Sequence, residues 1–503
     1  MQSTLTRSFA LKPLARISTL VVMAGISTAA QNASSPNAKI TRLDSTTITQ
    51  KQADETVTHL IEAAHLTGAG IAVFREGRIA FIKAYGLRDT EKKLPLTPDS
   101  VMTSASLSKA AFASVVMRLV QEGQLDLDKP VYQYLPLPLP DYPQYADLKG
   151  DDRYKKISLR MLLSHTSGFA NWRAFEEDRK LKIHFDPGTR FAYSGEGIQL
   201  AQLVVETVTS QSLTTLMEKK LFAPLQMSRT SMIWQAAFEN DFANGYDEYG
   251  RSLGPQKRTK PGAAGSMQTT LHDYALFLSA IMQDKLLDAK TTATMLRPQI
   301  NIRSAHQFPS LATETTAAND SIHLSYGLGW GIYSTPHSRA FFKEGHDEGW
   351  RHLALCFDQN GTGILIMTNS SNGEAIFKPL LDALLGSTYF PFNWEGYTPY
   401  TELPPPPKLK EHKRVVLTSA QLKQFEGKYA LPPQVVMTVT VENGHLFVQE
   451  NDEPKQELIP EGQQDFYSAS SSDECSFIPA DGTPYKAMVL HVDGKDIQLE
   501  RLH

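Results

Sequence analysis

The sequence has little cysteine, little net charge and few long apolar runs, and each scarcity excludes a class of protein. Only two cysteines occur among 503 residues. Cys356 and Cys475 fall in regions that we expect to be separate domains, so no structural disulfide is expected. The formal net charge is −4 and no basic block occurs, which argues against a nucleic-acid partner. After residue 30, no stretch approaches the roughly 20 apolar residues that span a membrane.

Two other catalytic signatures find no support. The one G-x-S-x-G match, GRSLG at residues 250–254, has a polar stretch before it and Pro255 directly after it, not the apolar strand and following helix of a nucleophile elbow, which disfavours an α/β-hydrolase. The sequence has no H-E-x-x-H segment and no cysteine–histidine cluster at metal-ligand spacing. We therefore expect no metal and no other cofactor, so that the chemistry has to come from ordinary side chains.

The first thirty residues differ in character from the rest. A short basic segment precedes the apolar run ISTLVVMAGISTAA, which ends in small residues. This pattern predicts a secretory signal peptide over residues 1–30, cleaved before Gln31. The alternative is a membrane anchor, for which the run is short. We expect an exported protein, periplasmic or secreted, with no membrane span after cleavage.

The length favours two domains, because one hydrophobic core rarely serves so long a chain. Residues 31–45 are polar and are expected to be flexible. Four consecutive prolines in ELPPPPKLKEHKR predict a stiff, extended linker. The boundaries that we expect are 46–395 for the larger domain, 396–414 for the linker and 415–503 for a small all-β domain.

The larger domain has strands near both ends and helices between them. GAGIAVFREGRIAFIKAYGLRD alternates apolar and polar residues around Glu76-Gly77, which predicts a hairpin. Such an order is typical of an α+β fold with one antiparallel sheet flanked by helices. Further strands are expected at 326–333, 351–358 and 362–369, and helices at 47–66, 106–123, 158–164, 197–219, 270–283, 289–296 and 373–386.

The last ninety residues alternate with a period of two. VVMTVTVENGHLFVQEN places Asn443-Gly444 between two such runs, the strongest short hairpin signal. The pattern repeats around Asp493-Gly494. We expect a small barrel or sandwich.

A serine and a lysine share one face at the start of the helix expected from Ser106. Ser106 and Lys109 are three residues apart, so their side chains are neighbours. If apolar neighbours desolvate the amine, its pKa falls and it can take the hydroxyl proton. The helix N-terminus also offers free N–H groups to a developing oxyanion. The pattern alone is weak, because S-x-x-K also occurs by chance on ordinary helix surfaces.

Tyr193 lies in FDPGTRFAYSGEG, after a Pro-Gly turn and before an expected helix. A tyrosine at such a place can act as a proton shuttle if nearby cations favour its anion. The alternative is a half-buried aromatic side chain with no chemical role.

Several segments together resemble one superfamily. The segments SLSK, ISLRMLLSHTSGF, YSG, PGAAGSMQTTLHDYALFLSAI and YGLGWGIY follow in its order between about residues 45 and 390. The chain resembles the serine β-lactamase and penicillin-binding-protein superfamily, in the branch of class C β-lactamases, D-aminopeptidases, DD-carboxypeptidases and related esterases. The resemblance implies a β-lactamase/transpeptidase-like fold, with a small barrel-like domain appended as in some relatives.

The resemblance implies a role for each of three residues. Ser106 would be the acylated nucleophile and Lys109 its neighbouring base. Tyr193 would relay the leaving-group proton and later activate water. Whether Lys109 or Tyr193 is the formal base stays open.

The third family motif, Lys-x-Gly or His-x-Gly, is expected in FFKEGHDEGW. Its first residue stands six positions before a Gly-aromatic pair, and counting back from Gly349-Trp350 reaches Lys343. Gly345 then provides the clearance for substrate beside the strand. Starting instead at His346 would lose that glycine, so Lys343 is favoured.

In this register His346 occupies the position whose backbone N–H, together with the backbone N–H of Ser106, forms the oxyanion hole. Its imidazole would lie at the cleft rim, in reach of substrate. Asp347 and Glu348 are expected in a solvated turn.

Gly195 departs from the family pattern. In penicillin-recognising relatives this position is an Asn that hydrogen-bonds the substrate's amide group, and its loss weakens discrimination for acylamino substrates. We expect a serine hydrolase for a small-molecule or peptide-like substrate, with an esterase favoured. A D-amino-acid peptidase or DD-carboxypeptidase, a β-lactamase, and a non-catalytic binding or regulatory protein remain alternatives.

Overall fold

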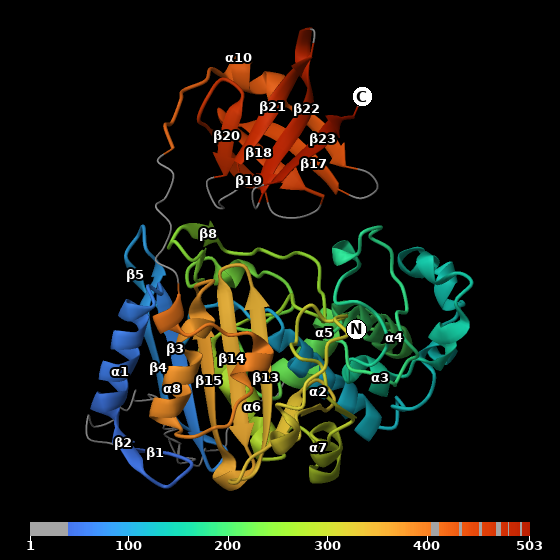
Figure 1. Ribbon diagram of the computed structural model, residues 1–503, viewed down its shortest axis with the longest axis vertical. Coiled ribbons are helices and arrows are strands. Elements are labelled where there is room, and N and C mark those ends of the chain that lie inside the picture. Colours follow the sequence, from blue (N-terminus) through green and yellow to red (C-terminus); the bar gives the residue numbers. More distant parts are fainter. Residues whose placement is uncertain are drawn as a thin grey trace, which may run out of the picture.

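The structure is a computed structural model that describes residues 39–403, 412–431, 435–451, 455–468, 474–480, 482–492 and 495–502. The expected signal peptide and the four prolines of the expected linker lie outside these residues. The described chain forms a layered sheet-and-helix body and a separate small barrel (Figure 1). Within the described residues, none of the helices combines the length and the apolarity that crossing a bilayer requires.

One nine-stranded antiparallel sheet organises the larger body, in the order β10-β11-β12-β13-β14-β15-β3-β4-β5. The N-terminal hairpin pairs with the C-terminal strands through β15 and β3, where Ile366 lies opposite Ile71. The expected α+β class is therefore confirmed. The strands are β3 (Gly68–Arg75), β4 (Arg78–Asp89), β5 (Leu94–Pro95), β10 (Ile300–Asn301), β11 (Ser325–Tyr326), β12 (Gly331–Ser334), β13 (Arg339–Asp347), β14 (Trp350–Phe357) and β15 (Thr362–Thr368).

Helices cover both faces of this sheet (Figure 1). Successive strand residues face opposite sides, so Ile71 and Val73 belong to one core and Ala72 and Phe74 to the other. On the first face lie α1 (Gln50–Ala63) and α8 (Phe377–Leu384). The second layer contains α2 (Leu107–Gln121), α3 (Leu159–Leu163), α4 (Gly195–Thr209), α5 (Leu213–Met217), α6 (Leu271–Met282) and α7 (Ala289–Met295).

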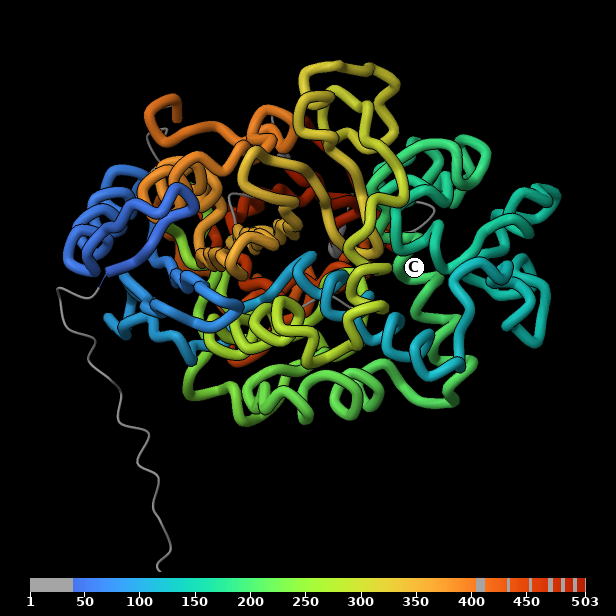
Figure 2. The backbone as a smooth tube through the Cα atoms, turned by 90° about the horizontal axis from the view of Figure 1, so that it is seen from below, coloured from blue at the N-terminus to red at the C-terminus, as the bar shows by residue number. Residues whose placement is uncertain are grey.

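Helix α2 is buried on nearly every side. Its sequence is apolar or small through most of its length, as expected of a helix enclosed by the core. It packs against β13, and Leu107 at the start of the helix lies beside Gly345 of that strand. Segment 131–157 forms short 3-10 turns at the periphery of the helical layer (Figure 2).

Two expected elements are interrupted. The helix expected over 197–219 divides into α4 and α5, because Ser210 adopts a left-handed conformation with φ of 51°. The strand expected over 326–333 divides into β11 and β12. Gly329 between them has φ of 86°, and a Cβ there would lie 2.4 Å from Cβ of Ala113 in α2. The break lets the backbone turn tightly against that helix.

The C-terminal part is a closed eight-stranded barrel above one end of the sheet (Figure 1). The Asn443-Gly444 hairpin is confirmed, and both residues have the positive φ that a type I′ turn requires. Asp493-Gly494 lies outside the described residues. The strands are β16 (Gly427–Leu431), β17 (Val435–Glu442), β18 (His445–Glu450), β19 (Gln456–Pro460), β20 (Asp465–Ser468), β21 (Glu474–Ala480), β22 (Gly482–Val492) and β23 (Lys495–Arg501).

Shorter elements complete the described chain. Cys356 in β14 and Cys475 in β21 are not joined by a disulfide. The remaining strands and α-helices are β1 (Lys39–Thr41), β2 (Thr47–Thr49), β6 (Met102–Thr103), β7 (Gly245–Tyr246), β8 (Ser252–Gly254), β9 (Gln268–Thr269), α9 (Phe392–Glu395) and α10 (Ser419–Leu422).

Candidate active site

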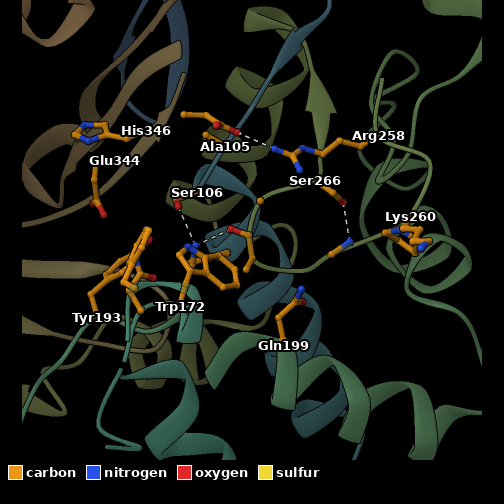
Figure 3. A pocket seen from close by; sticks show the side chains of 18 of the residues that line it. Ala105, Ser106, Trp172, Tyr193, Gln199, Arg258, Lys260, Ser266, Glu344 and His346 are labelled. Carbon is orange, nitrogen blue, oxygen red and sulfur yellow. Dashed lines mark hydrogen bonds and ion pairs between the residues drawn. The ribbon is translucent and has the colours of Figure 1, made fainter. Parts of the chain in front are cut away.

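Ser106 lies at the N-terminus of α2, on the wall of a cavity of about 860 Å³ (Figure 3). The residue before it, Ala105, has φ of 47°, an uncommon conformation for a residue with a side chain. Such local strain is often found where a reactive side chain must be held in place. The hydroxyl of Ser106 is only partly buried and lines the cavity.

Lys109 follows one helical turn later and contacts the serine. Its Nζ lies 2.8 Å from Oγ of Ser106 and donates to the backbone oxygen of Ala264 at 2.6 Å. Burial holds the pKa of Lys109 well below its usual range, and the positive charge of Lys343 adds to this effect. A neutral amine in contact with a hydroxyl can act as a base.

Tyr193 lies between two lysines. Nζ of Lys343 donates to its hydroxyl at 3.0 Å, and the amines of Lys109 and Lys343 lie 5.1 Å and 4.9 Å from the ring centroid. Burial raises the pKa of Tyr193 to about 12, although Lys343 and the contact with Ser106 act in the opposite direction. The phenol therefore keeps its proton at neutral pH. The ammonium of Lys343 lies close enough to stabilise the phenolate when it forms.

Lys343 is fully buried in β13. Burial by itself would lower the pKa of Lys343, but Glu344, whose carboxylate lies 2.6 Å from Nζ, and Tyr193 together outweigh it, and the pKa lies above its ordinary value. The structure thus brings Ser106, Lys109, Tyr193 and Lys343 into one continuous set of contacts.

His346 is placed differently from Lys343. Its ring packs against Tyr397 at 5.5 Å between centroids and does not reach Tyr193, and Figure 3 shows it set back from Ser106. Burial lowers the pKa of His346 to about 3, so the imidazole is neutral. That Lys343, and not His346, begins the third motif stays a prediction.

Gly345 sits where β13 approaches the nucleophile. Pairing of β13 with β12 ends at Phe342, so the strand edge beyond it is left open on this side. A Cβ at residue 345 would lie 2.8 Å from the backbone oxygen of Ser104 and 3.2 Å from Leu107. The glycine therefore lets the strand lie against the loop and helix that carry Ser106. The expected oxyanion hole between the N–H groups of Ser106 and His346 stays a prediction.

Gly195 begins α4, and an aromatic ring occupies the space beside it. A Cβ at this position would lie 2.4 Å from Cζ2 of Trp172. The indole lines the cavity and its ring centroid is 6.0 Å from Nζ of Lys109. An asparagine at position 195 would clash with this ring. No sequence motif pointed to Trp172, because its contact with position 195 arises only in the folded chain.

On the side of Ser106 away from Glu344, the cavity wall carries several positively charged side chains (Figure 3). Arg258 pairs with Asp347 at 3.1 Å, and Lys257 pairs with Glu239 at 2.7 Å. Asp347 is therefore part of an ion pair at the cavity, where the sequence had predicted only a solvated turn. Gln449 of the barrel strand β18 also lines this cavity, so the C-terminal domain contributes to its border.

A possible metal-ligand group lies elsewhere in the described residues. His412, Glu461 and Glu474 each offer a ligand atom, and these atoms lie within 4.8 Å of one another. His412 forms an ion pair with Glu461 at 3.1 Å and stacks on Tyr467, so ordinary contacts account for its position. The cavity around Ser106 shows no comparable group among the residues that the structure describes.

Comparison with known proteins supports this fold. The model of a family described as Beta-lactamase matches residues 53–386, and that of a domain of unknown function, DUF3471, matches residues 411–501. Protein flp of Staphylococcus aureus strain MRSA252 is 28% identical over 416 residues, which cover 79% of this chain and 74% of that protein. For strain N315 the match covers 36% of this chain and 38% of that protein. Penicillin-binding protein 4* of Bacillus subtilis is 22% identical and covers 89% of this chain and 98% of its own length.

Solved structures show the same fold. The octameric penicillin-binding protein homologue from Pyrococcus abyssi aligns with a TM-score of 0.55 at 19% identity, covering 90% of this chain and all of that one. The D-alanine carboxypeptidase AmpC from Burkholderia cenocepacia aligns with a TM-score of 0.51 at 20% identity, covering 64% and 93%. At these identities the likeness concerns the fold alone.

Proposed function

Since the chain belongs to the β-lactamase family, whose model matches residues 53–386, we propose that it is an exported serine hydrolase that forms an acyl-enzyme on an ester or amide, with esters favoured. The observation that carries the proposal is the unbroken set of contacts Ser106–Lys109 and Tyr193–Lys343 around one cavity. The catalytic unit is residues 46–395, joined through 396–414 to the small all-β domain, 415–503.

Acylation begins at Ser106. Neutral Lys109 takes the hydroxyl proton while Oγ attacks the carbonyl carbon, and the N–H groups of Ser106 and His346 stabilise the oxyanion. Tyr193 then gives its proton to the leaving group, and the ammonium of Lys343 stabilises the resulting phenolate. The raised pKa of Tyr193 and the lowered pKa of Lys109 favour Lys109 as the base of this step.

Deacylation uses the same groups, and each of them moves its proton in the opposite direction. The phenolate of Tyr193 takes a proton from water as the water oxygen attacks the acyl carbon. The proton that Lys109 gained then returns to Oγ of Ser106 as the acid product leaves. Each group ends in its starting protonation state, so the cycle can repeat.

The space next to Gly195 favours an ester substrate. Trp172 occupies the region into which an amide-binding side chain at position 195 would extend. A D-amino-acid peptidase or DD-carboxypeptidase is the second candidate, supported by the names of relatives such as the D-alanine carboxypeptidase AmpC. The signal-like first thirty residues support export. A non-catalytic binding role is disfavoured, because it gives no reason to keep all four side chains in contact.

Active-site labelling tests the proposal. A tagged fluorophosphonate or penicillin should label the wild type, and Ser106→Ala should abolish the labelling. Rates on an aryl ester, a D-alanyl anilide and a chromogenic cephalosporin then rank the substrate classes, with the ester expected to be fastest. Equal labelling of Ser106→Ala would show that the nucleophile is wrong, and fast cephalosporin hydrolysis would contradict the inference from Gly195.

A further inference from the structure

His165 is a fully buried histidine that takes no part in the steps described above. It follows the last residues of α3 and has φ of 55°, in the left-handed region. Two backbone hydrogen bonds close the turn, from His165 to Leu162 at 3.3 Å and from Thr166 to Met161 at 2.8 Å. At this position after a helix, glycine is the usual residue and asparagine the next. A histidine here therefore needs a reason beyond ending the helix.

The backbone on both sides of Tyr193 is hydrogen-bonded to His165. The N–H of Ala192 donates to the backbone oxygen of His165 at 2.8 Å. The N–H of Ser194, the N-cap residue of α4, donates to Nδ1 of the imidazole at 3.2 Å. A buried N–H needs an acceptor, and the imidazole supplies it. The tyrosine is thus held between two hydrogen bonds that end on one residue.

The imidazole also packs against the ring of Tyr193. The two ring centroids lie 4.3 Å apart, and the ring planes are tilted by 37°. The hydrogen bonds fix the backbone from which the tyrosine side chain extends, and the ring contact limits the rotation of that side chain. Together they set the position of the hydroxyl, which accepts from Lys343 at 3.0 Å.

These contacts require a neutral imidazole. Because Nδ1 accepts from Ser194, it carries no proton, and the proton of the neutral ring lies on Nε2. Burial, helped by the nearby lysines, holds the pKa of His165 well below its usual range. Nε2 is buried and makes no hydrogen bond within the described residues, which costs stability. A phenylalanine would avoid that cost, but it would leave the N–H of Ser194 without its acceptor.

We infer that His165 is a positioning residue for Tyr193, and that its neutral imidazole holds the phenol where it can protonate the leaving group. The inference rests on the proposed hydrolase function. His165 is not among the residues that line the cavity, and it acts through Tyr193 without exchanging a proton. Its basis is the pair of hydrogen bonds that flank Tyr193, together with the ring contact.

Two replacements separate the acceptor from the ring. His165→Phe keeps an aromatic ring but has no acceptor for Ser194. His165→Asn loses the ring, but its side-chain oxygen is as many bonds from the backbone as Nδ1, and asparagine tolerates positive φ. We expect the asparagine variant to retain more activity than the phenylalanine variant. His165→Ala, which also lacks the acceptor, takes the place of His165→Phe if that variant fails to fold.

The leaving group reports on the position of the phenol. An alkyl alcohol is a poorer leaving group than a phenol and depends more on a donated proton, so a displaced Tyr193 should slow alkyl esters more than aryl esters of the same acid. For His165→Phe, kcat/KM should fall about tenfold with the aryl ester and about 100-fold with the alkyl ester, since a small misplacement of a reacting group can cost about 100-fold. His165→Asn should keep a ratio of the two rates close to that of the wild type.

Tyr333→Phe is the matched control for a purely structural loss. Tyr333 is fully buried, its hydroxyl donates to the backbone oxygen of Thr388 at 2.9 Å, and it has no part in the proposed mechanism. Its replacement should lower stability without changing the ratio of the two rates. A merely structural role of His165 would likewise slow both esters equally. Equal losses with the two esters in the variant that lacks the acceptor, or a larger change of the ratio in His165→Asn, overturn the inference.

NMR spectroscopy tests the geometry without any substrate. At neutral pH the nitrogen signals of His165 should be those of a neutral ring with its proton on Nε2. The ring signal of Tyr193, identified by its loss in Tyr193→Phe, should shift or broaden in His165→Phe more than in Tyr333→Phe. These signals do not depend on turnover, so a failure of the hydrolase proposal is distinguishable from a failure of this inference. A charged His165, a proton on Nδ1 or an unchanged Tyr193 signal refutes it.

Discussion

Replacing Lys343 by methionine should slow acylation about 100-fold. Nζ lies 3.0 Å from the hydroxyl of Tyr193. At an effective dielectric constant of about 20, a full positive charge at that distance stabilises a full phenolate by about 5.5 kcal/mol. With about half of the negative charge developed in the transition state, the loss is about 3 kcal/mol, which corresponds to about 100-fold in rate.

The same replacement should also destabilise the fold. Glu344 would remain as a buried carboxylate without its cation, and breaking a buried ion pair costs about 3–5 kcal/mol. The double variant Lys343→Met with Glu344→Gln removes that charge. It should recover much of the lost stability in a denaturant titration while acylation stays slow, which separates the catalytic effect from the structural one.

The assay is the pre-steady-state acylation of Ser106 by an aryl ester, followed by stopped flow. His346→Ala serves as the comparison, because its ring packs on Tyr397 away from the reacting groups, and it should lose less than about fivefold. Acylation that is slower in His346→Ala than in Lys343→Met would show that the third motif begins at His346 and that the reasoning here is wrong.

Three further outcomes are expected. The kcat/KM of the wild type should fall as the pH drops below the lowered pKa of Lys109, because the ammonium form cannot accept the Ser106 proton. Lys109→Met should be far slower and should lack this acid limb of the pH profile. An acid limb that persists in the variant would exclude Lys109 as its source. Gly195→Asn should lower Tm, because the new side chain clashes with Trp172. The double variant with Trp172→Ala should regain stability and show higher activity on acylamino substrates. A Gly195→Asn variant as stable as the wild type would contradict the clash. Gly329→Ala should cost about 1–3 kcal/mol of unfolding free energy from overpacking against α2 in addition to backbone strain. Gly250→Ala, also at positive φ but with open space around it, should cost only about 1 kcal/mol, and equal losses would rule out the packing argument.

Local spacing made much of the site predictable from the sequence. Ser106 and Lys109 meet because helix geometry fixes residues three apart on one face, and the structure has them 2.8 Å apart. The Asn443-Gly444 turn is similarly local. The placement of Lys343 depended on a count within one strand and its following turn, where insertions have little room.

The features that the sequence did not reveal depend on contacts between distant segments. Arg258 precedes α6 and Asp347 ends β13, and no motif joins the two partners of this ion pair. Trp172 meets Gly195 only because the loop that carries Trp172 folds over the start of α4. The interruption at Gly329 was missed for a related reason, because alternating apolar residues in YGLGWGIY look like one strand until the packing against α2 is known.

The pairing of charges around the cavity bears on how substrate arrives. Lys343 is matched by Glu344, Arg258 by Asp347 and Lys257 by Glu239. Opposite charges this close cancel at a distance, so these three pairs project little field into solvent. Diffusional encounter with a neutral ester gains nothing from electrostatic steering in any case. If the proposed hydrolase function holds, the kcat/KM for such a substrate should therefore vary little with ionic strength.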